Sequence, residues 1–198
     1  MEILAPTFLE YWAVRRTLPR IRASRAGMRL ARWKGASPGS LVVVCGLAGA
    51  LAPGLPAGTV LIPAWIGLAD GRIAHCEPAL VQALEEAART LHFRYDSRPM
   101  LTTQSLVVGD DRHDWFGRGF VAADMETGLL AGQDLRLATV RVVLDHPEQE
   151  ISPRWQRPTS ALLQPQLWRE LIWLSHAAPR YALRAAEVLK VGLDLFTE

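Results

Sequence analysis

Phe120–Gly128, which reads F-V-A-A-D-M-E-T-G, and Ala138–Asp145, which reads A-T-V-R-V-V-L-D, decide the fold class. The first stretch changes from an apolar run to two carboxylates, Asp124 and Glu126, and leads into an amphipathic segment. The second is almost continuously apolar, as strands buried on both faces are, and it ends in a carboxylate. Ligands of open α/β sheets bind at the carboxyl ends of such strands. We therefore expect acidic groups from two neighbouring strand ends to face one crevice.

Asp124 and Glu126 could equally have a purely local role, which is to stabilise the start of a helix. Acidic residues near the start of a helix interact with the positive end of its dipole, which stabilises the helix by a few tenths to about 1 kcal/mol. From the residues alone, Asp124 and Glu126 fit this role as well as they fit a binding crevice.

Three blocks of the chain resemble, in the same order, motifs of the nucleoside phosphorylase and nucleosidase superfamily. This superfamily includes purine nucleoside phosphorylases and methylthioadenosine/adenosylhomocysteine nucleosidases. Val121–Glu126 resembles its V-D-M-E segment, and Val140–Asp145 resembles its later strand, which ends in the catalytic aspartate. Upstream, Val44–Leu51 and Gly58–Pro63 resemble its G-x-A-G-G-L and G-D-V-V-V block. The resemblance implies a phosphorylase-like α/β fold, and the alternation of apolar runs with helical segments also favours a three-layer α/β/α domain with a central mixed sheet.

Length and composition indicate a single globular domain over residues 1–198. The chain is long enough to bury a core, and its 49% hydrophobic and 21% charged residues are globular values. No apolar run approaches the roughly 20 residues that cross a bilayer, and the first residues do not read as a secretory signal. We therefore expect a cytoplasmic protein without a membrane span, in which Cys45 and Cys76 are reduced and buried.

Positive charge is concentrated near the N-terminus. There is no acidic residue between Tyr11 and Ala69, whereas eight basic residues fall between Arg15 and Lys34. Such a block is found at contacts with nucleic acid, an anionic membrane or phosphate, and also on solvated surfaces of arginine-rich chains. Because neither an aromatic-interleaved strand nor a reading helix accompanies it, we do not expect nucleic acid as a partner.

Apolar periodicity and turn residues predict the remaining elements. The expected strands cover residues 2–5, 28–33, 41–45, 60–66, 100–108 and 138–145, with a hairpin turn at 69–72. The expected helices cover residues 8–18, capped by Thr7, then 78–91, 162–176 and 179–196. Loops are expected at residues 109–115 and 146–159.

The resemblance implies a role for several residues of this chain. Asp145 would be the acid that donates a proton to the purine, Glu126 would hold the ribose hydroxyls, and Met125 would pack against the sugar. Glu10, near the end of the first strand, would position or activate the attacking water, although its place in the first turn of a helix also fits a dipole role. The turn that contains Gly46 and Ala48 would approach the ligand closely.

The chain also departs from the family pattern at three places. Leu47 stands where many relatives have a hydroxyl residue. Arg112 stands nearest to the position of the aromatic that stacks on the base, and it is expected to contact the substrate there. Trp115, or alternatively Phe116, would have to shift in to supply the stacking ring. About a dozen residues near 27–40 replace a longer segment that, in phosphorolytic members, helps to hold phosphate, so the chain is a shortened variant.

Other chemistries find no matching motif in the sequence. There is no H-x-x-x-H or paired C-x-x-C for a metal, no G-x-S-x-G elbow and no P-loop. Gly46–Gly49 lacks the middle glycine of a dinucleotide-binding turn, and Pro53 and Pro56 prevent a following helix. The remaining option is catalysis by carboxylates, without a metal or an organic cofactor. Phosphate would be an added co-substrate only if the reaction is a phosphorolysis.

These observations predict cleavage of the N-glycosidic bond of a purine nucleoside or nucleoside-like compound, by water or by phosphate. Arg16, Arg112 and Arg141 are the residues that would replace a lost phosphate cradle. The alternative is a non-catalytic nucleoside-binding or interaction protein on a degenerate phosphorylase fold, which the shortened segment, Leu47 and Arg112 all favour. The identity of the nucleoside and of the nucleophile stays open at this point.

The resemblance further implies at least a homodimer. Seven tryptophans exceed what one small core readily buries, and four of them fall in hairpin, loop or terminal-helix positions, namely Trp65, Trp115, Trp155 and Trp168. The alternative is that these rings pack within the monomer against arginine side chains.

Overall fold

Within residues 1–156 and 164–196, which the computed structural model describes, ten strands form one mixed sheet. The strand order is β6-β5-β8-β9-β3-β10-β4-β7, with β1 paired to β3 and β2 paired to β1. The strands are β1 (Glu2–Ala5), β2 (Ala23–Arg25), β3 (Ser40–Ala50), β4 (Val60–Leu61), β5 (Trp65–Leu68), β6 (Ile73–His75), β7 (Tyr95–Asp96), β8 (Met100–Thr102), β9 (Ala122–Asp124) and β10 (Leu135–Asp145).

The centre of the sheet is the parallel pair β3 and β10, each eleven residues long. Both strands are rich in valine, which suits a buried pleated surface. Arg141 lies opposite Gly46, and the register shifts by one residue just before Asp145, which lies opposite Gly49. Bulges of this kind re-aim side chains. Since β9 runs antiparallel to the end of β3, the ends of β9 and β10 flank the G-L-A-G segment of β3 on both sides.

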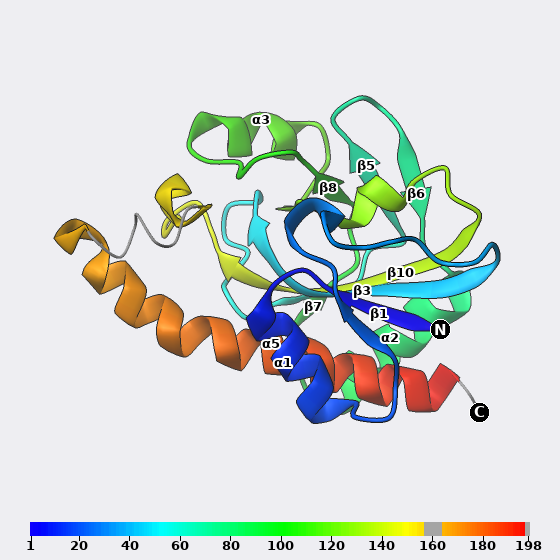
Figure 1. Cartoon of the computed structure of the whole chain (residues 1–198). Helices are drawn as coiled ribbons and strands as arrows, with labels where there is room; N and C mark the ends of the chain where they lie inside the picture. The colour runs from blue at the N-terminus through cyan, green and yellow to red at the C-terminus, as the bar shows by residue number, and fades with distance from the viewer. Residues whose placement is uncertain (157–163, 197–198) are drawn as a thin grey trace.

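Three helices cover one face of the sheet, namely α1 (Phe8–Thr17), α2 (Pro78–Thr90) and α5 (Trp168–Phe196) (Figure 1). Together with the sheet they enclose the larger hydrophobic core. Helix α1 begins with a capping box, in which Thr7 Oγ1 accepts the N–H of Glu10 and the Glu10 carboxylate accepts the N–H of Thr7. None of the helices in the described ranges, the 29-residue α5 included, has the length and apolar character that crossing a membrane requires.

The opposite face carries a smaller core, in which Leu4, Val42 and Val44 pack against the 3-10 helix η2 (Thr127–Leu130) and the segment 26–36. Helix α3 (Asp110–Gly117) lies on this side of the molecule, away from α1 and α5 (Figure 1). The mixed sheet with helices on its two sides confirms the predicted fold class.

Several predicted elements differ from the structure for identifiable reasons. Residues 28–33 form no strand, because Arg29 and Leu30 have φ values of 55° and 56° in the left-handed region, and Met28–Leu30 is instead a 3-10 turn, η1. The strand expected over 60–66 is divided into β4 and β5 around Pro63, which has no N–H to donate to a ladder. The strand expected over 100–108 ends at Thr102.

The two remaining corrections concern helices. The loop expected at 109–115 is helix α3, whose first turn carries Asp110 and Asp111, as the helix dipole favours. The two helices expected at 162–176 and 179–196 are one helix, α5, which continues through Pro179; residues 162 and 163 lie outside the described ranges. Proline in a helix interior loses a hydrogen bond, but the buried face that begins at Ala177 and Ala178 and continues to Leu193 packs on the rest of the domain and holds the helix together.

Candidate functional site

A pocket of about 260 Å³ lies at the carboxyl ends of β1, β3 and β10, next to the end of β9. Among the described residues that line it, all the charged ones are acidic: Glu10, Asp124, Glu126 and Asp145. Its apolar walls include Met28, Leu47, Leu106, Met125, Leu144 and Trp155. The two carboxylate-bearing strand ends of the sequence thus face one crevice.

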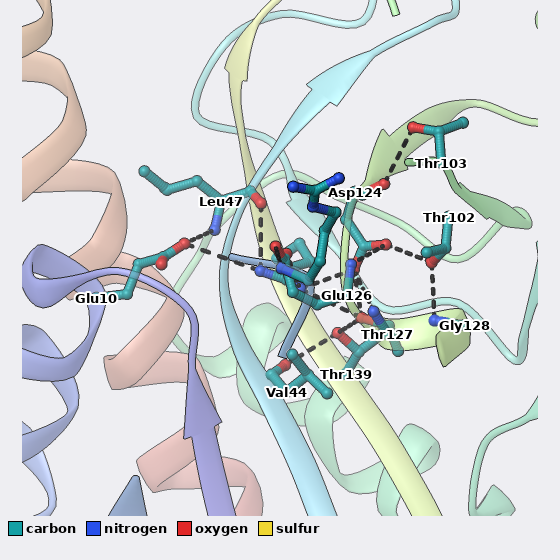
Figure 2. A network of polar contacts seen from close by, with 12 residues as sticks. Glu10, Val44, Leu47, Thr102, Thr103, Asp124, Glu126, Thr127, Gly128 and Thr139 are labelled. Atoms are coloured by element: carbon teal, nitrogen blue, oxygen red, sulfur yellow. Dashed lines mark hydrogen bonds and ion pairs between the residues drawn. The ribbon is translucent and has the colours of Figure 1, made fainter. Parts of the chain in front are cut away.

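One arginine holds three of these carboxylates below the pocket. Arg141 is fully buried, and its Nη2 donates to Asp124 Oδ2 at 2.7 Å and to Glu126 Oε2 at 3.2 Å. Its Nη1 lies 3.8 Å from Glu10 Oε1. Figure 2 shows Glu10 approaching this cluster from the α1 side and Asp124 and Glu126 from the opposite side. The cluster therefore ties helix α1, strand β10 and the β9–η2 junction to one guanidinium.

Asp124 is the structural member of the cluster. Besides Arg141, its carboxylate accepts hydrogen bonds from the hydroxyl groups of Thr102 and Thr127 and from the N–H of Thr127 at 3.1 Å. The bond from the Thr127 N–H lies at the first residue of η2, so the local capping role is present for Asp124. With its lone pairs occupied, Asp124 positions Arg141 and η2.

Glu126 has a different environment, because it lines the pocket while it is 5% exposed. Its Oε1 accepts the N–H of Arg29 at 3.1 Å, so the turn around η1 closes one side of the site. Burial raises the pKa of Glu126 to about 7; Arg141 opposes this shift, and the charges of Asp124 and Glu10 add to it. Burial alone would lower the pKa of Arg141, but the three carboxylates together raise it. Glu126 thus gains or loses a proton near neutral pH while Arg141 stays charged.

Glu10 is both a helix cap and a pocket residue. Its Oε2 accepts the N–H of Thr7 at 2.7 Å within the capping box, and its Oε1 accepts the N–H of Leu47 at 2.8 Å. Both roles that the sequence left open are therefore compatible with its position. A Cβ atom at Gly46 would lie 2.1 Å from Glu10 Oε1, so only glycine leaves room for this carboxylate. The adjacent Cys45 is a free, buried thiol whose pKa burial and then Glu10 raise to about 12, so it is no nucleophile at neutral pH.

Asp145 forms the other end of the pocket. Its Oδ2 accepts hydrogen bonds from Arg112 Nη2 and, at 3.3 Å, from the N–H of Ile151. Its Oδ1 lies beside Gly49, where a Cβ atom would be only 2.9 Å away. Burial raises the pKa of Asp145 above the ordinary aspartate value, and the charge and hydrogen bond of Arg112 act in the opposite direction.

The structure brings most of the predicted site residues together. Glu10, Ala48, Met125, Glu126 and Asp145 all line the pocket, and Gly46 lies directly behind Glu10.

Two predicted ligand contacts are not placed there. Arg112 does not line this pocket; it donates a hydrogen bond to Asp145 and lines a smaller adjoining hollow with Asp145 and Gly49. Trp115 lies in a separate hollow with Asp70 and Arg72, in edge contact with Phe120 at a ring-centroid distance of 6.0 Å. The alternative stacking ring, Phe116, packs against the main core.

Other pocket residues were not singled out from the sequence. Trp155 lines the wall, and its buried Nε1 has no hydrogen-bond acceptor among the described residues. Its position follows from tertiary packing, which leaves no local signal. Arg141 does have a signal, since a charged residue interrupts the apolar run from Val140 to Leu144 in the middle of a strand. Within the described ranges, no three His, Cys, Asp or Glu side chains are arranged to hold a metal ion, and the centre of the carboxylate cluster is occupied by Arg141.

Comparisons with known proteins identify the fold. The sequence matches no protein-family model, and no curated protein sequence matches it. Solved structures do match, among them a mutant of futalosine hydrolase from Helicobacter pylori, with a TM-score of 0.72, 13% identity and 98% of each chain covered. The 5′-methylthioadenosine/S-adenosylhomocysteine nucleosidase of the same organism matches with a TM-score of 0.74 at 12% identity over 98% of this chain and 97% of that chain. The corresponding nucleosidase of Neisseria meningitidis matches with a TM-score of 0.73 at 14% identity over 98% of each chain. The chain therefore has the nucleoside phosphorylase/nucleosidase fold, as the resemblance of its three sequence blocks implied.

Proposed function

We propose that this protein cleaves the N-glycosidic bond of a purine nucleoside or nucleoside-like compound, with water as the nucleophile. The observation that carries the proposal is the pocket at the strand ends, which is lined by three carboxylates, those of Glu10, Glu126 and Asp145.

The three carboxylates match the charge changes of this reaction. As the bond from C1′ to the purine nitrogen breaks, its electron pair goes to the base and positive charge builds on the sugar. Asp145 would donate a proton to the base, which needs the raised pKa that burial provides. Glu126 would accept hydrogen bonds from ribose hydroxyls, and the acidic cluster would stabilise the positive sugar. Glu10 would take a proton from the water that attacks C1′, so that the products are the free base and the free sugar.

The charges of the site favour water over phosphate. Phosphate needs several fixed donors, whereas the charged residues described around the pocket are all acidic and would repel a dianion. Two of the three arginines that would replace a phosphate cradle are already paired, Arg112 with Asp145 and Arg141 with the carboxylate cluster. The third, Arg16, lies over the ring of Trp12 on helix α1.

The test is release of free base from a panel of purine nucleosides, measured by chromatography with and without phosphate. The panel includes adenosine, inosine, 5′-methylthioadenosine, S-adenosylhomocysteine and futalosine. We expect one of these compounds to be cleaved in phosphate-free buffer at a rate that added phosphate does not increase. Release that depends on phosphate would replace the hydrolytic proposal with phosphorolysis.

One observation favours a second candidate, a protein that binds nucleosides without cleaving them. Asp145 is paired with Arg112, and a carboxylate that stays ionised in such a pair is a poor proton donor. A nucleoside that raises the melting temperature, as linkage requires of a ligand of the folded state, without any release of base on prolonged incubation would support this candidate.

We also propose that the chain forms a homodimer through its helical layer. Phe8 is 66% exposed and Ile172 is 62% exposed, on helices α1 and α5, which pack against each other (Figure 1). Large apolar side chains in these positions are typical of protein interfaces. Of the tryptophans named from the sequence, Trp168 on α5 is 56% exposed and supports the proposal, whereas Trp115 packs within the monomer against Arg118 at 4.5 Å.

A further inference from the structure

We propose that Arg112 is the positioning residue of Asp145: it holds Oδ2 and leaves Oδ1 as the carboxyl oxygen presented to the pocket. The inference rests on the proposed function, because it assigns the proton that Asp145 donates to Oδ1. It also replaces the role in substrate binding that the sequence favoured for Arg112.

Arg112 is itself fixed from all sides. The side chain is 3% exposed. Its Nη1 donates to the carbonyl oxygen of Ala50 at 2.6 Å, and its Nε donates to the carbonyl oxygen of Val107 at 3.0 Å. Nε also lies 3.1 Å from Glu150 Oε1. With these contacts made, the remaining nitrogen, Nη2, is directed at Asp145. The fixed fork geometry of a guanidinium suits such a set of acceptors.

Glu150 extends this arrangement to the start of helix α3. Its carboxylate accepts the N–H of Gly109, immediately before α3, at 2.9 and 3.2 Å. Glu150 therefore fixes both the helix that carries Arg112 and the Arg112 side chain. The segment after β10 thus holds Asp145 in place in two ways. Glu150 binds Arg112, and the N–H of Ile151 donates a hydrogen bond to Asp145 Oδ2.

The two oxygens of Asp145 are therefore different. Oδ2 accepts two hydrogen bonds, whereas Oδ1 lies in the space that the missing side chain of Gly49 leaves free. A proton on Oδ1 can pass to a ring nitrogen of the base while the guanidinium at Oδ2 stabilises the carboxylate that remains. Arg112 would thus assist proton donation without touching the substrate.

Charged groups from several elements face Asp145. Arg112 comes from α3 and Glu150 from the segment after β10, and the carboxylates of Glu10, Asp124 and Glu126 lie around the same pocket. Burial raises the pKa of Asp145, Arg112 lowers it and Glu150 raises it. Removal of the arginine charge should therefore let Asp145 keep its proton to higher pH and release it to the base less readily.

The experiment compares wild type with Arg112→Gln, Arg112→Lys and the control Arg118→Gln, which removes an exposed arginine just after the same helix. The first readout is the pH titration of the Asp145 carboxyl carbon by ¹³C NMR, assigned by its absence in Asp145→Asn. We expect the midpoint to rise by about one pH unit or more in Arg112→Gln and to stay near the wild-type value in Arg112→Lys, which keeps the charge. Thermal melting of each variant verifies that it is folded.

The second readout is the pH profile of kcat/KM with the nucleoside that the panel identifies. We expect a kcat about 10- to 100-fold lower in Arg112→Gln, with the high-pH limb moved upward, and partial rescue by Arg112→Lys. An unchanged midpoint and an unchanged pH profile in Arg112→Gln would overturn the positioning role, even in an active enzyme. If Arg112→Gln does not fold, a midpoint in Arg112→Lys far from the wild-type value would overturn it. A shifted midpoint in a protein that cleaves no nucleoside would instead refute the proposed function and leave the pairing of Arg112 with Asp145 intact.

Discussion

Replacement of Glu126 with glutamine should stabilise the folded protein above pH 7 and change its stability little below pH 5. In the folded state Glu126 is buried beside Asp124 and Glu10, and its pKa is about 7 against an ordinary value of 4.5. Between these two values the folded state keeps a proton that the unfolded chain has released. The stability of the wild type therefore falls as the pH rises through this window and is constant above it. Glutamine does not titrate, so the stability of the variant does not fall through this pH window for this reason.

The size of the effect follows from the difference between the two pKa values. A difference of 7 minus 4.5, or about 2.5 units, at 1.36 kcal/mol per unit corresponds to roughly 3 kcal/mol in the free energy of unfolding. For a chain of 198 residues, each 1 kcal/mol moves the melting temperature by about 2–4 °C. The melting temperature of Glu126→Gln relative to wild type should therefore rise by roughly 6–12 °C between pH 5 and pH 8.

The assay is thermal unfolding of wild type and variant across this pH range at constant ionic strength. The control is Glu187→Gln, which removes the same charge from an exposed position on helix α5. Melting curves of Glu126→Gln that run parallel to those of the wild type at every pH would refute the reasoning. So would a wild type that gains stability relative to the variant as the pH rises.

Three shorter predictions concern the pocket wall and the surface. Gly49→Ala should lower the rate of base release at least 10-fold, because its Cβ would lie 2.9 Å from Asp145 Oδ1 and the carboxylate would have to shift. The control Gly117→Ala, with no atom within 4 Å of its Cβ, should leave the rate unchanged. Trp155→Ala should weaken nucleoside binding by calorimetry about 5- to 10-fold, because the indole ring forms part of the apolar wall of the pocket. Unchanged affinity would remove Trp155 from the ligand contacts. Sedimentation at micromolar concentration should give a dimer that Ile172→Glu dissociates, and a wild-type species at 21.9 kDa would contradict the interface.

The sequence was most informative where local chemistry and tertiary packing agree. The valine-rich runs of β3 and β10 and the Thr7 capping box have the expected form because burial and hydrogen bonding favour the same local structure. Prediction was wrong where packing dominates. Helix α5 continues through Pro179 because its flanking alanines are buried against the rest of the domain. The left-handed turn at Arg29, which closes the site over Glu126, has no signature in residue type.

The same distinction between local sequence signals and tertiary packing applies to the residues of the candidate site. Asp145 and Glu126 could be named because they stand in blocks that resemble motifs of the superfamily, Asp145 at the end of β10 and Glu126 just after β9. The structure gathers both at one pocket. The side chain of Arg112 could not be placed from the sequence, because it reaches Asp145 only through the fold of α3 and the segment after β10. Trp155 likewise lines the pocket from a segment in which apolar residues have neither helical nor strand spacing, so its position could not be predicted.

The central claim is that the carboxylates of this pocket break a glycosidic bond with Asp145 as the acid. Its most direct test is the rate of base release by wild type and Asp145→Asn in phosphate-free buffer, with the nucleoside that the panel identifies and with both proteins verified as folded by thermal melting. Asparagine keeps the shape of the side chain and an acceptor for Arg112 but has no acidic proton to transfer to the base. We predict a loss of about 10²- to 10⁴-fold in the rate. Equal rates for the two proteins would contradict the assignment of Asp145 and, with it, the proposed mechanism.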